Sequence, residues 1–322
     1  MTDWQPSASL NNLQKRAELL RYIREFFHQH NVLEVDTPVM SNCAVSDPFI
    51  DTLEVNYQSA VGLPVDTLYL QTSPEYAMKR LLAAGSGAIY QMGKVFRNGE
   101  YGGRHNPEFT MLEWYRPGFT DSDLMDEVEA LVRPLLQCQP IERITYSDLF
   151  KRYLGFRPEA VTLNELVAET QKHIDIELED SDPNTWLNLL MSHVIEPELV
   201  SVDALFVTDY PASQAALAKV RKNPQGQSVA ARFELFVKGV ELANGYHELT
   251  DWEEQKMRLE SDQALRQQLG LPERPLDYRL VDALKSGMPE CAGVALGVDR
   301  LLMLILSTGQ ISDVLPFDLP KA

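Results

Sequence analysis

The connection between two strand-like segments places the strongest constraint on how this chain folds. Residues 89–96 and 109–115 are rich in aromatic, β-branched and other apolar side chains, and the loop between them holds three glycines and a proline. Strands joined by such a loop pair antiparallel. A second hairpin is predicted from residues 233–237 and 240–243 around a two-residue turn at Lys238-Gly239. Because strands and helices do not alternate as βαβ units, we expect an α+β fold with an antiparallel sheet flanked by helices.

The spacing of apolar residues predicts the helices. Apolar positions three and four residues apart predict helices at 11–30 and 121–136. A polar helix is predicted at about 250–268, and a helix at 299–307 follows a glycine-punctuated strand at 293–297. A further helix is predicted to open at Ser73-Pro74-Glu75, with Ser73 as N-cap and Pro74 as its first residue, and to end at Gly85.

The length of 322 residues allows one large domain or two smaller ones. We expect one catalytic domain over residues 1–322. Within it, residues 138–202 are polar, favour helix and carry no motif, so we interpret them as a mainly helical insertion.

The charge balance argues against a nucleic-acid partner. The chain has 29 Lys and Arg against 47 Asp and Glu, a formal net charge of −18. Nucleic-acid-binding proteins usually present a basic face, because neutralising phosphates supplies much of their affinity. We therefore expect that tRNA is not the substrate, although a local basic groove would be compatible with the total.

The chain lacks the sequence features of a secreted or membrane protein. No stretch approaches the roughly 20 apolar residues of a membrane span, and the N-terminus has neither a basic nor an apolar signal region. Cys43, Cys138 and Cys291 are odd in number and widely spaced, so they predict neither a disulfide framework nor a metal site. We expect a cytoplasmic protein.

The first hairpin carries residues suited to nucleotide chemistry. Arg97 ends one strand, and a guanidinium matches phosphate oxygens bidentately and stabilises charge when the α-phosphate is attacked. Phe109 offers a flat face for adenine, and Glu113 and Tyr115 could hold an amino group. A plain hairpin with a solvated basic loop would account for Arg97 alone. The whole run of residues 104–115 is too specific to be a coincidence.

The second hairpin carries two acids. A two-residue turn would place Phe236 opposite Glu241 and Glu234 opposite Ala243, with Glu234 and Glu241 diagonal on one face, about 7–8 Å apart. Two such carboxylates suit a magnesium ion that also binds ATP phosphates. The alternative is a solvated strand face that happens to bear acids.

These segments resemble the class II aminoacyl-tRNA synthetases. Residues 96–115 resemble motif 2, residues 293–300 resemble motif 3, and residues 26–38 resemble motif 1, the element that forms the dimer. Residues 241–248 are similar to the ATP- and lysine-binding stretch of the lysyl branch. The resemblance runs from about residue 11 to the end and implies an ATP-dependent, adenylate-forming ligase that uses Mg²⁺ and is a homodimer.

The resemblance also implies roles for individual residues. It implies that Arg97 and Arg300 are catalytic and that Glu234 and Glu241 bind the metal ion. It assigns the amino-acid substrate to Ser73, Pro74, Glu75, Glu113, Tyr115 and Glu248, with Glu248 and Tyr115 at the side-chain ammonium. It assigns ATP to Arg97, Asn98, Gly99, Asn106, Phe109, Glu241, Leu242, Gly297 and Arg300.

Several features depart from an ordinary lysyl-tRNA synthetase. The catalytic motifs begin almost at the N-terminus, so we expect no N-terminal OB domain, and Ala295 stands where the synthetase has glycine. Together with the net charge, these features resemble the stand-alone members of the family, which attach β-lysine to elongation factor P. The motif 2 acid is also shifted, since Gly99 stands where a glutamate is usual and Glu100 follows it. The alternatives are a free-standing lysyl-tRNA ligase and a non-catalytic synthetase paralogue.

Overall fold

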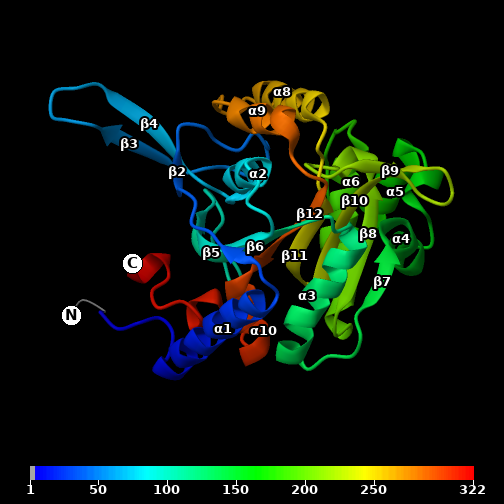
Figure 1. The fold of residues 1–322 in the computed structure, drawn as a ribbon. Helices are drawn as coiled ribbons and strands as arrows, with labels where there is room; N and C mark the ends of the chain where they lie inside the picture. Colours follow the sequence, from blue (N-terminus) through cyan, green and yellow to red (C-terminus); the bar gives the residue numbers. More distant parts are fainter. Residues whose placement is uncertain (1–3) are drawn as a thin grey trace. The chain divides into compact units, whose positions relative to one another are not determined.

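The structure is a computed structural model that describes residues 4–322, and the chain divides into two compact units. Unit 1 comprises Met1–Phe119 and Leu249–Ala322, and unit 2 comprises Thr120–Glu248. Figure 1 shows the elements of both units.

Unit 1 contains three antiparallel strands bordered by a short parallel one. β5 (Ile89–Phe96) pairs with β6 (Glu108–Pro117), and β6 pairs with β12 (Cys291–Gly297), both antiparallel. β1 (Leu33–Glu34) pairs parallel to β5, so the predicted antiparallel sheet has a parallel edge. The helices are α1 (Leu10–Gln29), α2 (Glu75–Ala83), α8 (Trp252–Gln268), α9 (Tyr278–Gly287) and α10 (Val298–Leu306).

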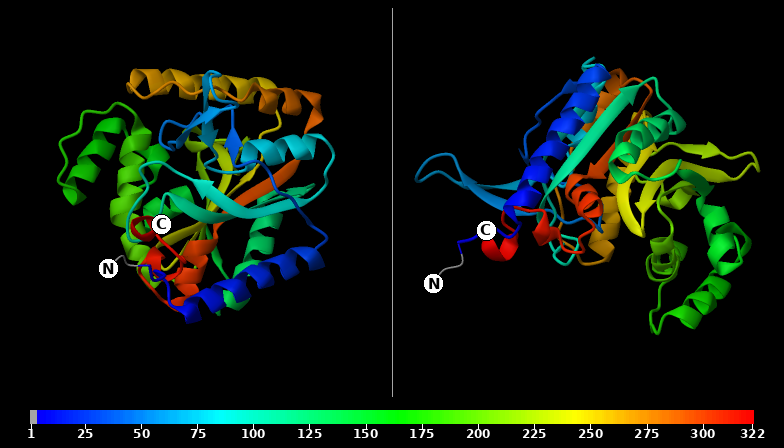
Figure 2. Two further views of the ribbon diagram at one scale, coloured as in Figure 1. Left: turned by 90° about the vertical axis from the view of Figure 1, so that its left-hand side faces the viewer. Right: turned by 90° about the horizontal axis from the view of Figure 1, so that it is seen from below.

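Helices cover both faces of these strands. On one face, Phe27 of α1 stacks on Tyr90 at 4.4 Å between ring centroids and meets Trp114 edge-on at 5.3 Å. On the other face, Ile89 and Tyr115 join a buried cluster with side chains of α2 and α9. α1 accordingly lies along the strands, as Figures 1 and 2 show.

A second, small sheet of unit 1 consists of β2 (Met40–Ser41), β4 (Val65–Leu70) and β3 (Glu54–Gln58) in that order. The β3–β4 hairpin extends away from the rest of unit 1 (Figures 1 and 2).

Unit 2 is a helix-covered sheet. β11 (Val240–His247), β10 (Ser228–Val237) and β8 (Leu205–Pro211) are antiparallel neighbours, β7 (Glu142–Thr145) is parallel to β8, and β9 (Val220–Lys222) pairs with the start of β10. Its helices are α3 (Asp121–Leu136), α4 (Tyr146–Leu154), α5 (Leu163–His173), α6 (Pro183–Leu190) and the short α7 (Glu196–Glu198). A buried cluster that includes Phe150, Trp186 and Phe236 joins α4, α5 and α6 to the sheet.

The two predicted hairpins form, with one error in register. Lys238 and Gly239 have φ of 49° and 71°, the left-handed values of a two-residue turn, and Phe236 pairs with Glu241 as predicted. Glu234 pairs with Asn244 and not with Ala243, because the register shifts between Leu235 and Phe236. A β-bulge of this kind places one extra residue in one strand, and the turn alone does not predict it.

Two helix predictions needed correction. α2 begins at Glu75, and Pro74 is its N-cap without a capping side-chain bond, so the predicted roles of Ser73 and Pro74 were displaced by one residue. Ser73 still caps the helix locally, since its Oγ accepts the Glu75 N–H at 3.0 Å. α9 was not predicted at all.

None of the helices formed by residues 4–322 has the length and hydrophobicity that crossing a bilayer requires.

Candidate active site

Glu113 lies in a row of residues that crosses three strands of unit 1. Gln91 of β5 pairs with Glu113, and Glu113 pairs with Ala295 of β12. Directly opposed residues of antiparallel strands project to the same face with Cβ atoms about 4.5–5.5 Å apart. The methyl group of Ala295 is therefore a neighbour of the Glu113 side chain.

A hydrogen-bond network fixes the buried Glu113 carboxylate. The Ser73 hydroxyl donates to Oε2 at 2.8 Å, and the Tyr115 hydroxyl donates to Oε1 at 2.6 Å. Glu113 is only 2% exposed. Ser73 also accepts the N–H of Glu75, so four of the predicted substrate residues meet in one network.

The fully buried Lys79 is a participant that the sequence prediction missed. Its Nζ lies 2.7 Å from Oε1 of Glu75, one turn earlier on α2. A buried cation needs a paired charge, and Glu75 supplies it. The four-residue spacing of a glutamate and a lysine on a predicted helix was the signal that could have revealed the pair.

Arg97 and Phe109 come together where β5 and β6 meet the loop. The Arg97 guanidinium lies over the Phe109 ring, 5.3 Å from its centroid, and its Nη1 is 3.5 Å from Glu100. Arg97 Nε is buried and has no hydrogen-bond partner within the described residues. A buried donor without a partner is costly, and a phosphate oxygen would satisfy it, so this residue fits the ATP expected here.

The loop after Arg97 is anchored to the base of the β3–β4 hairpin. Asn98 donates from its backbone N–H to the Asp51 carbonyl at 3.0 Å and from Nδ2 to Asp51 Oδ2 at 2.8 Å. Arg274 binds Asp51 Oδ1 at 2.9 Å. Burial raises the pKa of Asp51, but the hydrogen bonds from Arg274 and Asn98 outweigh it and leave that pKa below its usual value. Gly99 has φ of 79°, which disfavours a side chain at the position where motif 2 usually has glutamate.

Asn106 and Arg300 mark the other side of the loop. Asn106 is buried, its Nδ2 donates to the Glu108 carbonyl at 2.7 Å, and its Oδ1 accepts the Leu319 N–H at 3.0 Å. The Asn106 amide thus fixes the loop to the C-terminal segment. Arg300 Nη2 lies 2.7 Å from His105 Nε2, and the nearest atoms to a Cβ added at Gly297 would be those of the Arg300 side chain, at 3.6 Å.

A second buried residue that the prediction missed, Arg16 of α1, ties the motif 2 and motif 3 segments together. Its Nη1 lies 2.5 Å from Asp299 Oδ1, and its Nη2 donates to Thr110 Oγ1 at 2.6 Å. The Thr110 N–H donates to Asp299 Oδ2 at 2.7 Å. Asp299 therefore anchors the start of α10, next to Arg300, to the strand that carries Phe109.

The β10–β11 hairpin of unit 2 carries the buried carboxylate of Glu234, and two neighbouring side chains bind this carboxylate. Tyr210 donates to Glu234 Oε2 at 2.7 Å, and Arg232 binds Oε1. Burial raises the pKa of Glu234, the Arg232 cation lowers it, and the nearby Glu241 carboxylate raises it again, with a net increase. A cation between Glu234 and Glu241 would relieve this repulsion, so the donor set fits the expected magnesium.

Two further groups of β11 and its end are buried near these acids. Asn244, directly opposite Glu234, has a buried Oδ1 that accepts no hydrogen bond within the described residues. Asn244 lies within residues 241–248, but the sequence analysis assigned it no role. Glu248 is buried and follows β11, where it forms an isolated bridge with Ala218. Gly245 is required by packing, because a Cβ there would lie 2.3 Å from the Phe233 ring.

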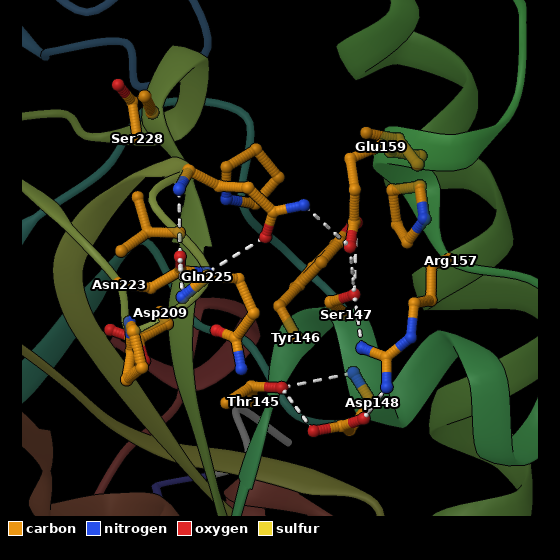
Figure 3. Close-up of a pocket in the computed structure, with 17 residues that line it drawn as sticks. Thr145, Tyr146, Ser147, Asp148, Arg157, Glu159, Asp209, Asn223, Gln225 and Ser228 are labelled. Atoms are coloured by element: carbon orange, nitrogen blue, oxygen red, sulfur yellow. Dashed lines mark hydrogen bonds and ion pairs between the residues drawn. The ribbon is translucent and has the colours of Figure 1, made fainter.

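Unit 2 also contains a pocket that none of the predicted site residues lines. It has a volume of about 680 Å³ and lies between the start of α4, residues 157–159 at the start of a short 3-10 helix, and the β9–β10 turn (Figure 3). Sequence patterns gave no indication of it, because its walls come from segments far apart in the chain.

Comparison with known proteins places these observations in a family. A family model described as tRNA synthetases class II (D, K and N) matches residues 1–321. The chain is 51% identical over 323 residues to a Vibrio cholerae protein named elongation factor P–(R)-beta-lysine ligase, covering 100% of this chain and 99% of the relative. Proteins with the same name from Haemophilus influenzae and Mannheimia succiniciproducens are 47% and 48% identical, each over 99% or more of this chain and 98% or more of the relative.

Proposed function

The chain belongs to the class II tRNA synthetases for aspartate, lysine and asparagine, and we propose on that basis that it is an ATP-dependent ligase that attaches β-lysine to elongation factor P. The observation that carries the proposal within this family is the Glu113 network, in which a buried carboxylate is fixed beside the methyl group of Ala295. A buried anion of this kind suits an amine-bearing substrate. The full-length relatives named for this activity support the same choice of substrate and acceptor.

The proposed reaction has two steps. A carboxylate oxygen of the amino acid attacks the α-phosphorus of ATP, the bond to the bridging oxygen of the β-phosphate breaks, and pyrophosphate leaves. The ε-amine of an acceptor lysine then attacks the carbonyl carbon of the adenylate, AMP leaves, and the nitrogen loses a proton. Neither step needs a covalent bond to the enzyme, so catalysis rests on positioning and on neutralising charge.

In this proposal each part of the site has one task. Arg97 and Arg300 bind the nucleotide, with Asn98, Gly99, Asn106, Phe109, Glu241, Leu242 and Gly297 around it. Glu113 and Glu75 bind the amine nearest the carboxylate, with Ser73 and Pro74 beside them, and Glu248 and Tyr115 bind the side-chain ammonium. Magnesium, when bound, would neutralise phosphate charge, and Glu234 and Glu241 would hold it.

We further propose that the protein is a cytoplasmic homodimer that pairs through residues 26–38, and that tRNA is not its acceptor. The acidic net charge of −18 supports a protein acceptor over a nucleic acid.

ATP–pyrophosphate exchange, measured with α-lysine and with each β-lysine enantiomer, tests the first step. Intact-mass spectrometry of elongation factor P after incubation with enzyme, ATP and β-lysine tests the second, and we expect one added lysyl increment. Efficient charging of tRNA with an unmodified factor would favour a lysyl-tRNA ligase instead, and absence of exchange with every diamino acid would favour a non-catalytic paralogue.

A further inference from the structure

The pocket of unit 2 is large, and its wall has an apolar part and a polar part. Its volume of about 680 Å³ lies within the range of about 300–1,000 Å³ that is typical of ligand pockets. Apolar side chains, among them Leu187 and Val229, line part of the wall, and the remainder consists mostly of carboxylates, amides and hydroxyls. This combination suits a ligand with an aliphatic stem and a polar head.

The polar wall is held together by its own hydrogen bonds. Ser147 donates to Glu159 at 2.8 Å, Gln227 Nε2 donates to Glu159 Oε1 at 3.3 Å, and Asn223 Nδ2 donates to Gln227 Oε1 at 2.9 Å. Figure 3 shows this chain of contacts from the start of α4 to the β9–β10 turn. The wall is therefore organised before any ligand arrives, which lowers the entropic cost of binding.

The charges of the wall favour a cation. Three carboxylates line the pocket against one guanidinium, and that guanidinium, Arg157, is engaged with Asp148 at 2.5 Å. Asp209 is engaged with Arg221 at 2.8 Å. Glu159 is different, because among the described residues its carboxylate is held only by the neutral donors Ser147 and Gln227. It is an anion that forms no ion pair among the described residues: Arg157, the nearby cation, pairs with Asp148 and reaches Glu159 only through Ser147, to whose hydroxyl its Nη1 donates at 3.0 Å.

The pocket lies at the end of the unit 2 sheet where β11 ends. β10 begins at Ser228, which lines the pocket, and runs antiparallel to β11, so the start of β10 and Glu248 are at the same end of the sheet. The strand β9 connects the two places, since it follows Ala218, the bridge partner of Glu248, and leads into the turn that forms one wall. A macromolecular substrate whose reactive amine approaches this end would have the pocket within its footprint.

We propose that this pocket is a docking site for a basic side chain, lysine or arginine, on the surface of the acceptor protein, with Glu159 as its ionic partner. The aliphatic stem would lie along the apolar wall, and the side-chain amides of Asn223, Gln225 and Gln227 would bind the backbone beside it. The inference rests on the proposed function, because it requires a protein acceptor. An acidic enzyme also attracts a basic partner surface and increases the rate of encounter.

The test separates amino-acid activation from transfer to the acceptor. Glu159→Lys reverses the charge in the pocket, and Glu179→Lys, at an exposed position in the same unit that does not line the pocket, makes the same charge change elsewhere. Both variants should keep wild-type ATP–pyrophosphate exchange, which also confirms that they fold. The KM for elongation factor P should rise about five- to tenfold in Glu159→Lys only, and the difference should shrink at high salt.

Each other outcome has a definite meaning. Equal transfer kinetics for Glu159→Lys and Glu179→Lys, with an active wild type, would overturn the docking site and leave the ligase proposal intact. A wild type that exchanges pyrophosphate but does not modify the factor would overturn both. Should Glu159→Lys lose exchange, Glu159→Gln, which keeps the shape of the side chain, replaces it, and an unchanged KM for the factor would again overturn the docking site.

Discussion

Arg16 and Asp299 form a buried ion pair, with Nη1 and Oδ1 2.5 Å apart, between residues 283 positions apart in the sequence. The pair adjoins residues that we assign to the nucleotide, because Asp299 precedes Arg300 and the same guanidinium binds Thr110, which follows Phe109. It therefore fixes two elements that we assign to ATP.

Replacing Arg16 should weaken both folding and ATP binding. Arg16→Met leaves a buried carboxylate without its cation, which typically costs about 3–5 kcal/mol in the free energy of unfolding. Arg24→Met, on the same helix, removes an exposed pair with Glu34 and should cost less than about 1 kcal/mol. Urea denaturation of both variants measures the difference.

Exchange kinetics distinguish a positioning role of Arg16 from a purely structural one. In Arg16→Met the KM for ATP should rise while the KM for the amino acid stays close to wild type, because Glu113 is held by Ser73 and Tyr115. A variant that is less stable but has both KM values unchanged would refute the positioning role. Arg16→Lys should recover part of the stability, since it restores the charge but lacks the second guanidinium nitrogen that binds Thr110.

Arg97→Ala should reduce ATP–pyrophosphate exchange by about two orders of magnitude, the usual scale for the loss of one preorganised charge donor. Arg116→Ala is a suitable control, because Arg116 is also on unit 1 but its guanidinium lies over Phe119 at 4.6 Å, away from the loop. Near wild-type exchange in Arg97→Ala would contradict the assignment of motif 2.

Glu248→Gln should lower kcat/KM for the amino acid, because it replaces a charge-assisted contact with a neutral one. The decrease should correspond to a loss of about 1.5–3 kcal/mol of transition-state stabilisation. The KM for ATP should change little. Equal kcat/KM for the variant and the wild type would show that Glu248 does not contact the substrate.

The contribution of Asp51 to stability should depend on pH. Its pKa is lowered in the folded protein, so its stabilising effect is present above the unfolded pKa of about 4 and is lost as the pH falls through the folded value. Asp51→Asn should therefore lower Tm at pH 7, and the gap from wild type should narrow below about pH 4. A gap that stays constant down to acid pH would show that the charge of Asp51 contributes nothing.

The sequence was most informative where the structure is local. β5 and α3 have the predicted boundaries, because apolar periodicity and turn residues act within a few positions of each other. α9 was missed although Leu280, Val281 and Leu284 have helical spacing and are buried, so a signal was present in that case. The bulge opposite Leu235 and Phe236 could not be predicted from the sequence, because one extra residue changes the register without changing the pattern.

In the candidate site as well, the sequence was least informative about contacts between residues that are far apart in the chain. Motif residues such as Arg97 and Glu113 stand out because their neighbours form a recognisable run. Arg16 does not, since nothing in α1 indicates that its partner lies near the end of the chain. The docking pocket is even harder to predict from the sequence, because α4 and the β9–β10 turn form its walls only in the folded chain.

The last prediction concerns Ala295, which pairs with Glu113 across β12 and β6. One methyl group in a tight site typically discriminates between substrates by about 1–3 kcal/mol. In β-lysine the amine nearest the carboxylate is one carbon further along the chain than in α-lysine, so it meets Glu113 from a displaced position and leaves space where the methyl group lies. The wild type should therefore prefer β-lysine.

Ala295→Gly should gain activity toward α-lysine in ATP–pyrophosphate exchange and should lose part of its preference for β-lysine. Ala292→Gly serves as a control, because Ala292 is on the same strand but pairs with Arg116, three residues from Glu113, and projects to the opposite face. Ala292→Gly should leave activity toward α-lysine unchanged, because the methyl group that it removes does not face Glu113, so the ratio of kcat/KM for the two substrates should change only in Ala295→Gly. An unchanged ratio in that variant would place the discrimination elsewhere in the site.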